Sequence, residues 1–281
     1  RDRLMVDTKN LVGEFTWDTS LTFSKTNSFW KERLPNYDYQ IYQQRENEPM
    51  SAYYYYNVTG IINTDRSNMP ESQKTLQAEA QLPGCPIIED KNKDGKIDEN
   101  DVYMKDNSPA IYVGIGNTFT YKRFEFSFFM YGQFGIQKYN IAYSAAQAGP
   151  LAVDYPENSN KFAYRLWNSQ TNPNGSRPGL AIGKMGALPG NAWVNADREN
   201  ASFMRMRNIT LAYNLAGNIL GSLQRYVRNI KVYVDAQNPF ILTKFQGFDP
   251  EIYTGGGGAS GGSRGEYPQA RTFSLGVNIT F

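Results

Sequence analysis

The sequence predicts an all-β fold, an antiparallel transmembrane β-barrel with long extracellular loops, on three observations. The stretch 272–281 (TFSLGVNITF) alternates polar or small residues with apolar ones without exception. Long connecting segments alternate with short turns along the chain. Tyr and Phe are abundant, with 20 and 16 copies in 281 residues. Alternating strands, loops sorted by length and girdles of aromatic residues are features of outer-membrane barrels.

The final stretch alone does not decide between a membrane and a soluble sheet. Its apolar positions are Phe273, Leu275, Val277, Ile279 and Phe281. A tilted strand of this length crosses the hydrocarbon core of a bilayer. The same alternation suits the last strand of a half-buried soluble sandwich.

Composition excludes several classes of function. No run of eighteen apolar residues is present, so the sequence predicts no transmembrane helix. The absence of histidine removes Ser-His-Asp triads, Cys-His pairs and HExxH zinc sites. A single cysteine, Cys85, excludes a disulfide within the chain. The net charge of +2 does not indicate binding to nucleic acid.

The start of the sequence carries no export signal. It opens at Arg1, without a Met, in what reads as a polar segment. A membrane-barrel protein should begin with such a signal. We therefore expect the chain to be the C-terminal part of a longer protein.

Alternation predicts the strands of the wall in chain order. In the first, Glu14 and Asp18 fall on the polar face, which suits a water-filled lumen better than a protein core. Lys122 and Arg123 leave only a tight turn between two later strands, which predicts a hairpin. The predicted strands are 13–24, 53–62, 111–121, 124–133, 204–214, 229–237 and 271–281.

The connections support a barrel wall. Short connections at 122–123 and 215–228 alternate with long polar loops at 63–110, 134–202 and 238–270. Outer-membrane barrels have short periplasmic turns and long extracellular loops, whereas long structureless connectors are uncommon in compact domains. Residues 25–51 are an exception, because parity requires a short turn there. Residues 1–12 receive no assignment.

Residues 90–101, DKNKDGKIDEND, read as a calcium-binding loop of the EF-hand type without its flanking helices. Gly95 takes position 6, where the backbone turns sharply, and Ile97 takes the apolar position 8. Asp in place of Glu at position 12 shortens the reach of that ligand. The alternative is an acidic surface turn. The predicted ligands of a structural Ca²⁺ ion that pins the loop are Asp90, Asn92, Asp94, the backbone carbonyl of Lys96, and Asp101.

Five segments in a fixed order resemble the C-terminal part of the SusC-like (RagA-like) TonB-dependent outer-membrane transporters. The likeness covers most of residues 84–281 and is weaker over 13–62. Cys85 departs from the pattern, because the family more often has an acidic residue there, and we assign it no function. The segments are the Asp90–Asp101 loop, NTFTYKRFEFSFFMYGQFG at 117–135, SFMRMRNITLAYNL at 202–215, VYVDAQNPFILTKFQGFDPE at 232–251 and YPQARTFSLGVNITF at 267–281.

The resemblance implies a 22-stranded plugged barrel in the bacterial outer membrane, with the C-terminus at the periplasmic side. Such transporters import oligosaccharides or peptides, work with a SusD-like surface lipoprotein that lids the barrel, and receive energy through TonB. In the family, the plug domain and the TonB-contacting segment belong to the N-terminal part, so we expect them outside this chain. A partial wall exposes two strand edges in lipid, so we expect it to be stable only beside the remainder of the barrel.

No catalytic residues are predicted, since no pair of carboxylates stands out among the scattered Asp and Glu. The leading hypothesis is nutrient import, and the alternative is a secreted, calcium-stabilised β-sandwich that binds carbohydrate or protein. Under the leading hypothesis, aromatic residues of two long loops are candidates for stacking on a substrate or packing against the lid, although ordinary loop packing explains them as well. They are Tyr155, Trp167, Trp193 and Tyr253.

Overall fold

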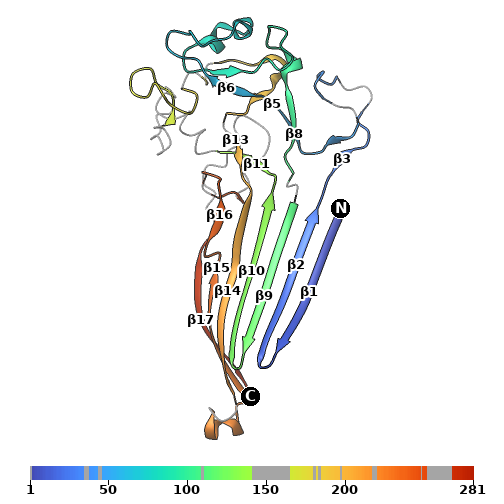
Figure 1. The fold of residues 1–281 in the computed structure, drawn as a ribbon, viewed down its shortest axis with the longest axis vertical. Helices are drawn as coiled ribbons and strands as arrows, with labels where there is room; N and C mark the ends of the chain where they lie inside the picture. The colour runs from blue at the N-terminus through green and yellow to red at the C-terminus, as the bar shows by residue number, and fades with distance from the viewer. Residues whose placement is uncertain are drawn as a thin grey trace.

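The computed structural model consists of one long antiparallel sheet and a compact region at one end of it (Figure 1). Within the described residues, no helix is long and apolar enough to cross a membrane. The structure describes residues 2–34, 38–43, 46–108, 111–140, 165–179, 182, 185–196, 198–216, 220–247, 249–251 and 268–281.

The long sheet, called the wall here, has the strand order β1-β2-β9-β10-β14-β15-β17, with β16 also paired to β14. Every pairing in it is antiparallel, so the prediction of an all-β antiparallel fold is confirmed. Its strands are β1 (Asp2–Val12), β2 (Phe15–Lys25), β9 (Ile111–Tyr121), β10 (Phe124–Phe134), β14 (Phe203–Ala216), β15 (Asn229–Gln237), β16 (Ile241–Thr243) and β17 (Thr272–Thr280).

The two faces of the wall differ in chemistry because the strands alternate. On one face, the ring of Phe119 stacks on Trp17 at 5.8 Å and on Phe126 at 6.1 Å between centroids. On the other face, Asp18 lies opposite Lys9 across β1 and β2. Among the described residues, no second sheet packs against the apolar face, and Leu275 on β17 is 75% exposed.

The connections of the wall are sorted between its two ends (Figure 1). Gly13 and Glu14 join β1 to β2, and Lys122 and Arg123 join β9 to β10. Gly13 and Lys122 take positive φ angles of 61° and 54°, which these two-residue turns require. The chain's C-terminus lies at the same end, called the short-turn end here, and the long connections leave from the other.

Two expectations about the N-terminal quarter need correction. Residues 53–62 do form strands, β5 (Ala52–Tyr56) and β6 (Val58–Ile61), but these belong to the compact region and not to the wall. The unassigned residues at the start supply β1 instead. Because residues 52–62 do not form a strand of the wall, the whole segment between β2 and β9 is one long connection. Residues 25–51 are therefore no longer an exception to the alternation of short and long connections.

The compact region, called the cap here, comprises residues 46–108, 165–179 and 185–196. In it β5 pairs with β8 (Tyr103–Asp106) and with β12 (Trp193–Val194), and β6 pairs with β7 (Pro86–Ile88). Its short 3-10 helices are η1 (Glu71–Thr75), η2 (Ala78–Gln81), η3 (Glu99–Asp101) and η6 (Pro189–Asn191). The remaining short pairs are β3 (Phe29–Trp30) with β4 (Glu48–Pro49), and β11 (Gln137–Tyr139) with β13 (Arg198–Asn200).

The cap has a hydrophobic core of its own. Consecutive tyrosines suit β5 because both of its faces meet other residues: Tyr55 stacks on Tyr53 and Tyr103 on one face, and Tyr54 contacts Tyr42 on the other. The buried core residues are Tyr56, Ile62, Leu76, Ala80, Cys85, Ile87, Ile88, Ile97, Val102, Met185, Leu188 and Ala192.

Two buried polar side chains connect segments of the cap. Gln73 is fully buried; its Nε2 donates to the carbonyls of Ala80 and Pro86, and its Oε1 accepts from the backbone N–H of Ile88. The Tyr56 hydroxyl donates to the carbonyls of Asp98 and Pro189, both at 3.0 Å. Burial raises the pKa of Tyr56, so the hydroxyl stays a donor.

Candidate functional site

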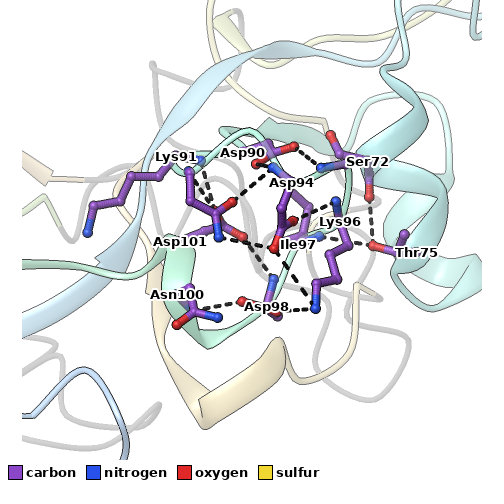
Figure 2. A network of polar contacts seen from close by, with 12 residues as sticks. Ser72, Thr75, Asp90, Lys91, Asp94, Lys96, Ile97, Asp98, Asn100 and Asp101 are labelled. Carbon is purple, nitrogen blue, oxygen red and sulfur yellow. Dashed lines mark hydrogen bonds and ion pairs between the residues drawn. The ribbon is translucent and has the colours of Figure 1, made fainter.

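The acidic loop 90–101 folds as a series of side-chain-to-backbone hydrogen bonds (Figure 2). The two carboxylate oxygens of Asp90 accept from the N–H groups of Asp94 and Gly95. Asn92 Oδ1 accepts from the N–H of Asp94 at 3.1 Å, and Asp94 Oδ1 accepts from the N–H of Lys96 at 3.1 Å. Gly95 has a φ of 87°, which is why position 6 is glycine. The first three predicted ligands therefore converge on one tight turn.

Asp101, the residue at position 12, has a different environment. It is fully buried. Its Oδ1 accepts from the N–H groups of Lys91 and Asn92, and its Oδ2 accepts from the N–H of Asp98. Asp98 in turn accepts from the N–H of Asn100, which completes a capping box on η3. Asp101 therefore closes the loop on itself.

Lys96 supplies a cation inside the loop. Its Nζ lies 3.0 Å from Asp98 Oδ2 and 3.9 Å from Asp94 Oδ2. The hydrogen bond to Asp98 and the charges of both carboxylates raise the pKa of Lys96. The loop is fastened to η1 by the Thr75 hydroxyl oxygen, which accepts from the N–H of Ile97 at 3.0 Å.

These residues fit a calcium ion in part. Asp90, Asn92 and Asp94 offer oxygens around one turn, and hydrogen-bonded carboxylates keep further lone pairs for a hard cation. Asp101 is already committed to three amide groups. In the described part of the chain, no group of three or more His, Cys, Asp or Glu is arranged to hold a metal ion. Calcium stays a prediction.

The polar face of the wall carries paired charges. Lys231 Nζ on β15 bonds both carboxylate oxygens of Glu125 on β10, at 2.9 and 3.0 Å. Thr210 donates to Asp235 at 2.6 Å across β14 and β15. Farther along the sheet, a hollow of about 560 Å³ is lined by residues that include Asp7, Lys9, Asp18, Thr118, Ser127 and Asn208. A face of this kind fits contact with water and polar groups.

A buried ion cluster fastens the start of β14 to the connection after β16, and sequence reasoning missed it. Arg205 is 3% exposed and pairs with Asp249 at 2.6 Å and with Glu251. Asp249 also accepts from the N–H groups of Glu251 and Gln269. The available signal was a pair of arginines, Arg205 and Arg207, near the start of a wall strand, together with an acidic pair in the segment FDPE.

A second cluster joins two connections of the wall. Glu199 pairs with Arg177 at 2.6 Å. It also accepts from the side chain of Asn140 and from the N–H of Gln246. Residues from the β10–β14 connection and from the segment after β16 thus meet at one carboxylate.

Several known proteins similar to this chain are TonB-dependent receptors. TonB-dependent receptor P3 of Formosa agariphila is 26% identical over 98% of the chain. TonB-dependent receptor SusC of Bacteroides thetaiotaomicron is 32% identical over 68% of it. The chain belongs to the SusC-like TonB-dependent receptors. No family model matches the chain.

The fold agrees with this membership. A solved structure of the RagAB peptide transporter matches 99% of the chain with a TM-score of 0.68 at 19% identity. The chain spans about 28% of the length of P3 and of the RagAB chain, and 17% of SusC. It is thus part of a SusC-like transporter of the bacterial outer membrane, a family of transporters and not of enzymes.

The four aromatic candidates for contact with substrate or lid are not brought together in the described structure. Tyr155 and Tyr253 lie outside the described residues. Trp193 is placed by its backbone in β12, opposite Tyr55 of β5. The ring of Trp167 lies against Gly84, where an added Cβ would be 2.7 Å from Trp167 Cε3. That contact gives Trp167 a packing role, and a role in transport stays a prediction for all four.

Proposed function

We propose that this chain is a stretch of wall, with its cap, of a 22-stranded plugged barrel that imports oligosaccharides or peptides by TonB-dependent active transport. The observation that carries the proposal is the wall itself, which has an exposed apolar face, a polar face with paired charges and an unpaired edge on each side. Within the described residues, β1 pairs only with β2 and β17 only with β15. Open strand edges are not tolerated in lipid, so both need neighbouring strands of the same barrel.

The proposal also assigns sides and partners. The short-turn end and the C-terminus face the periplasm, and the cap faces outward, where a SusD-like lipoprotein lids the barrel. TonB contacts another part of the same protein. Two findings support this: the connections are sorted by length, and the chain is similar over almost its whole length to part of the RagAB peptide transporter.

The structure gives no support to the alternative of a soluble β-sandwich. A sandwich buries the apolar face of one sheet against a second sheet. Here large apolar residues along the wall stay exposed, and the hydrophobic core lies in the cap. The homology to TonB-dependent receptors points the same way.

Uptake by the full-length transporter tests the proposed function. A strain that lacks the transporter gene is complemented with the intact gene, in the presence and absence of TonB, and supplied with labelled oligosaccharides or labelled oligopeptides. We expect uptake of one cargo class that requires both the transporter and TonB. Uptake of neither class, or uptake independent of TonB, would contradict the proposal.

We further propose that loop 90–101 binds a structural Ca²⁺ ion through Asp90, Asn92, Asp94, the Lys96 carbonyl and Asp101. Support comes from the turn that gathers the first three side chains. Titration of the full-length protein with Ca²⁺, followed calorimetrically, should give a stoichiometric site that is lost in Asp90→Asn. The control is Glu71→Gln, an exposed carboxylate of the cap that pairs with Lys74. Identical titrations of the parent protein and Asp90→Asn would contradict the proposed Ca²⁺ site.

A further inference from the structure

The short-turn end of the wall combines exposed apolar side chains with an excess of basic ones. We propose that this end, called the basic rim here, is a binding surface for anionic glycerophospholipid in the adjacent leaflet. The inference rests on the outer-membrane placement and is independent of the cargo. Its residues are Tyr121, Lys122, Arg123, Phe124, Leu223, Arg225, Tyr226 and Arg228.

The β14–β15 connection carries half of the basic rim. It contains η8 (Gly221–Arg225), which projects beyond the strands at the short-turn end (Figure 1). Leu223 and Tyr226 are 54% and 69% exposed, and Arg225 and Arg228 are exposed beside them. The turn has a defined backbone, because the N–H groups of Tyr226 and Val227 both donate to the carbonyl of Leu223. Exposed apolar and basic side chains on one ordered turn suit the boundary between acyl chains and headgroups.

The β9–β10 turn repeats this composition. The Lys122 ammonium lies 5.4 Å from the ring centroid of Tyr121, and both residues are exposed. Phe124, which follows Arg123, meets Tyr213 of β14 at 4.7 Å between ring centroids. These rings continue the apolar face of the wall, which already faces lipid, to its edge. Aromatic residues at this level are typical of membrane interfaces.

Backbone contacts make the two turns one continuous surface. The N–H of Asn214, near the end of β14, donates to the carbonyl of Arg123 at 2.9 Å. The N–H of Arg228 donates to the carbonyl of Thr280 on β17 at 2.7 Å. The two turns and the end of the final strand therefore lie side by side.

Charge selects the class of lipid. The short connections at this end carry four basic side chains and one acidic one, Glu14. Glu14 lies 3.4 Å from Lys122, and both side chains are more than half exposed, so this pair is weak. The remaining surplus of positive charge favours phosphate-bearing lipids over zwitterionic ones.

Depth measurements on the reconstituted full-length transporter test the insertion. Nitroxide labels are placed at Leu223→Cys and Tyr226→Cys, with Ser222→Cys on the same turn as the matched control, in bilayers of phosphatidylethanolamine and phosphatidylglycerol. We expect labels at 223 and 226 to collide with O₂ more than with a water-soluble nickel chelate, and the label at 222 to show the reverse. Nickel access equal to that at 222, or protection from both reagents, would overturn the proposal.

Lipid retention tests the charge. Native mass spectrometry of the transporter should show phosphatidylglycerol bound in preference to phosphatidylcholine. Retention should fall about fivefold for each basic side chain removed, in Arg225→Gln and Arg225→Gln/Arg228→Gln. Lys74→Gln in the cap is the control and should change nothing. Equal retention of the two lipids, or no loss in the double variant, would overturn the preference for anionic lipid.

Discussion

The wall and the cap are built from the same chain on opposite principles. In the wall, large side chains such as Phe273 and Leu275 are exposed, and charged ones pair on the other face. In the cap, Tyr56, Ile62 and Ile88 are buried in a core that polar side chains connect. A water-soluble region hides its apolar groups, whereas a region in lipid needs only to satisfy its backbone. The two regions should therefore respond differently to the same substitution.

The most severe test removes the neighbours of the wall. A chain of residues 1–281 expressed alone should fail to give a heat-resistant folded barrel, because β1 and β17 keep open edges. The measurement is electrophoretic mobility of boiled and unboiled samples in detergent, with the full-length transporter as control. Recovery of a folded, heat-resistant species would show that the wall closes without the rest of the protein.

The next largest effect is expected at the buried ion cluster. Arg205→Gln should destabilise the start of β14 and its link to the connection after β16 by ~3–5 kcal/mol, because Asp249 and Glu251 keep buried charge without a cationic partner. The matched control is Lys231→Gln, which breaks a better-solvated pair with Glu125 and should cost about 1 kcal/mol or less.

Thermal unfolding and limited proteolysis of the full-length transporter measure this difference between the two variants. Equal melting temperatures for Arg205→Gln and Lys231→Gln would show that the buried cluster contributes no more than the partly solvated pair.

A pair of aliphatic truncations compares the two regions directly. Ile88→Ala in the cap core should cost ~2–5 kcal/mol, since it leaves a cavity. Leu275→Ala on the wall should cost about 1 kcal/mol or less, because lipid chains fill the space of the removed methyl groups. Denaturant melts in lipid bilayers measure both. A larger loss of stability for Leu275→Ala than for Ile88→Ala would contradict the assignment of lipid surroundings to the wall and of a buried core to the cap.

The smallest expected effect is on the rate at which maleimide labels Cys85. Cys85 is fully buried in the cap, and burial raises the pKa of its thiol to about 11. Since the thiolate is the reactive form, maleimide labelling at pH 8 should be slower than at an exposed cysteine by roughly 100-fold from this cause alone. Peptide mass spectrometry locates the label, and Ile88→Ala should accelerate it. Fast labelling of the parent protein would mean that the cap core opens readily.

Sequence patterns predicted most of the wall but not its first strand, nor the short β16, which lies in the predicted loop 238–270. The bounds of β2, β9, β10, β14, β15 and β17 agree with the predicted ranges to within two residues, because lipid on one face and polar surroundings on the other leave a period of two. In β1 the pattern is broken by Thr8 and Asn10 on the side of Leu4 and Val6. Lys9 lies opposite Asp18 on the next strand, a pairing that the sequence of β1 alone does not show.

Local patterns were less informative about the cap and the candidate site. A strand that is buried on both faces does not alternate polar and apolar residues. The sequence of β5 was therefore interpreted as a weak strand of the wall. The ligand spacing of loop 90–101 correctly indicated a turn at Gly95, but it could not show that Asp101 points to three backbone amides. The cluster around Arg205 joins residues more than forty positions apart, which no window of sequence brings together.

The parallel pairing of β12 with β5 has a consequence for the order of folding. Trp193 lies opposite Tyr55, and Asn195 bonds to Asn57, so the cap draws on two different connections of the wall. Closing such a long stretch of chain is entropically costly and slow, whereas adjacent hairpins form quickly. The hairpins β1–β2 and β9–β10 should therefore form before the cap does. The cap can then form only when the wall strands that its segments connect already lie in their native order.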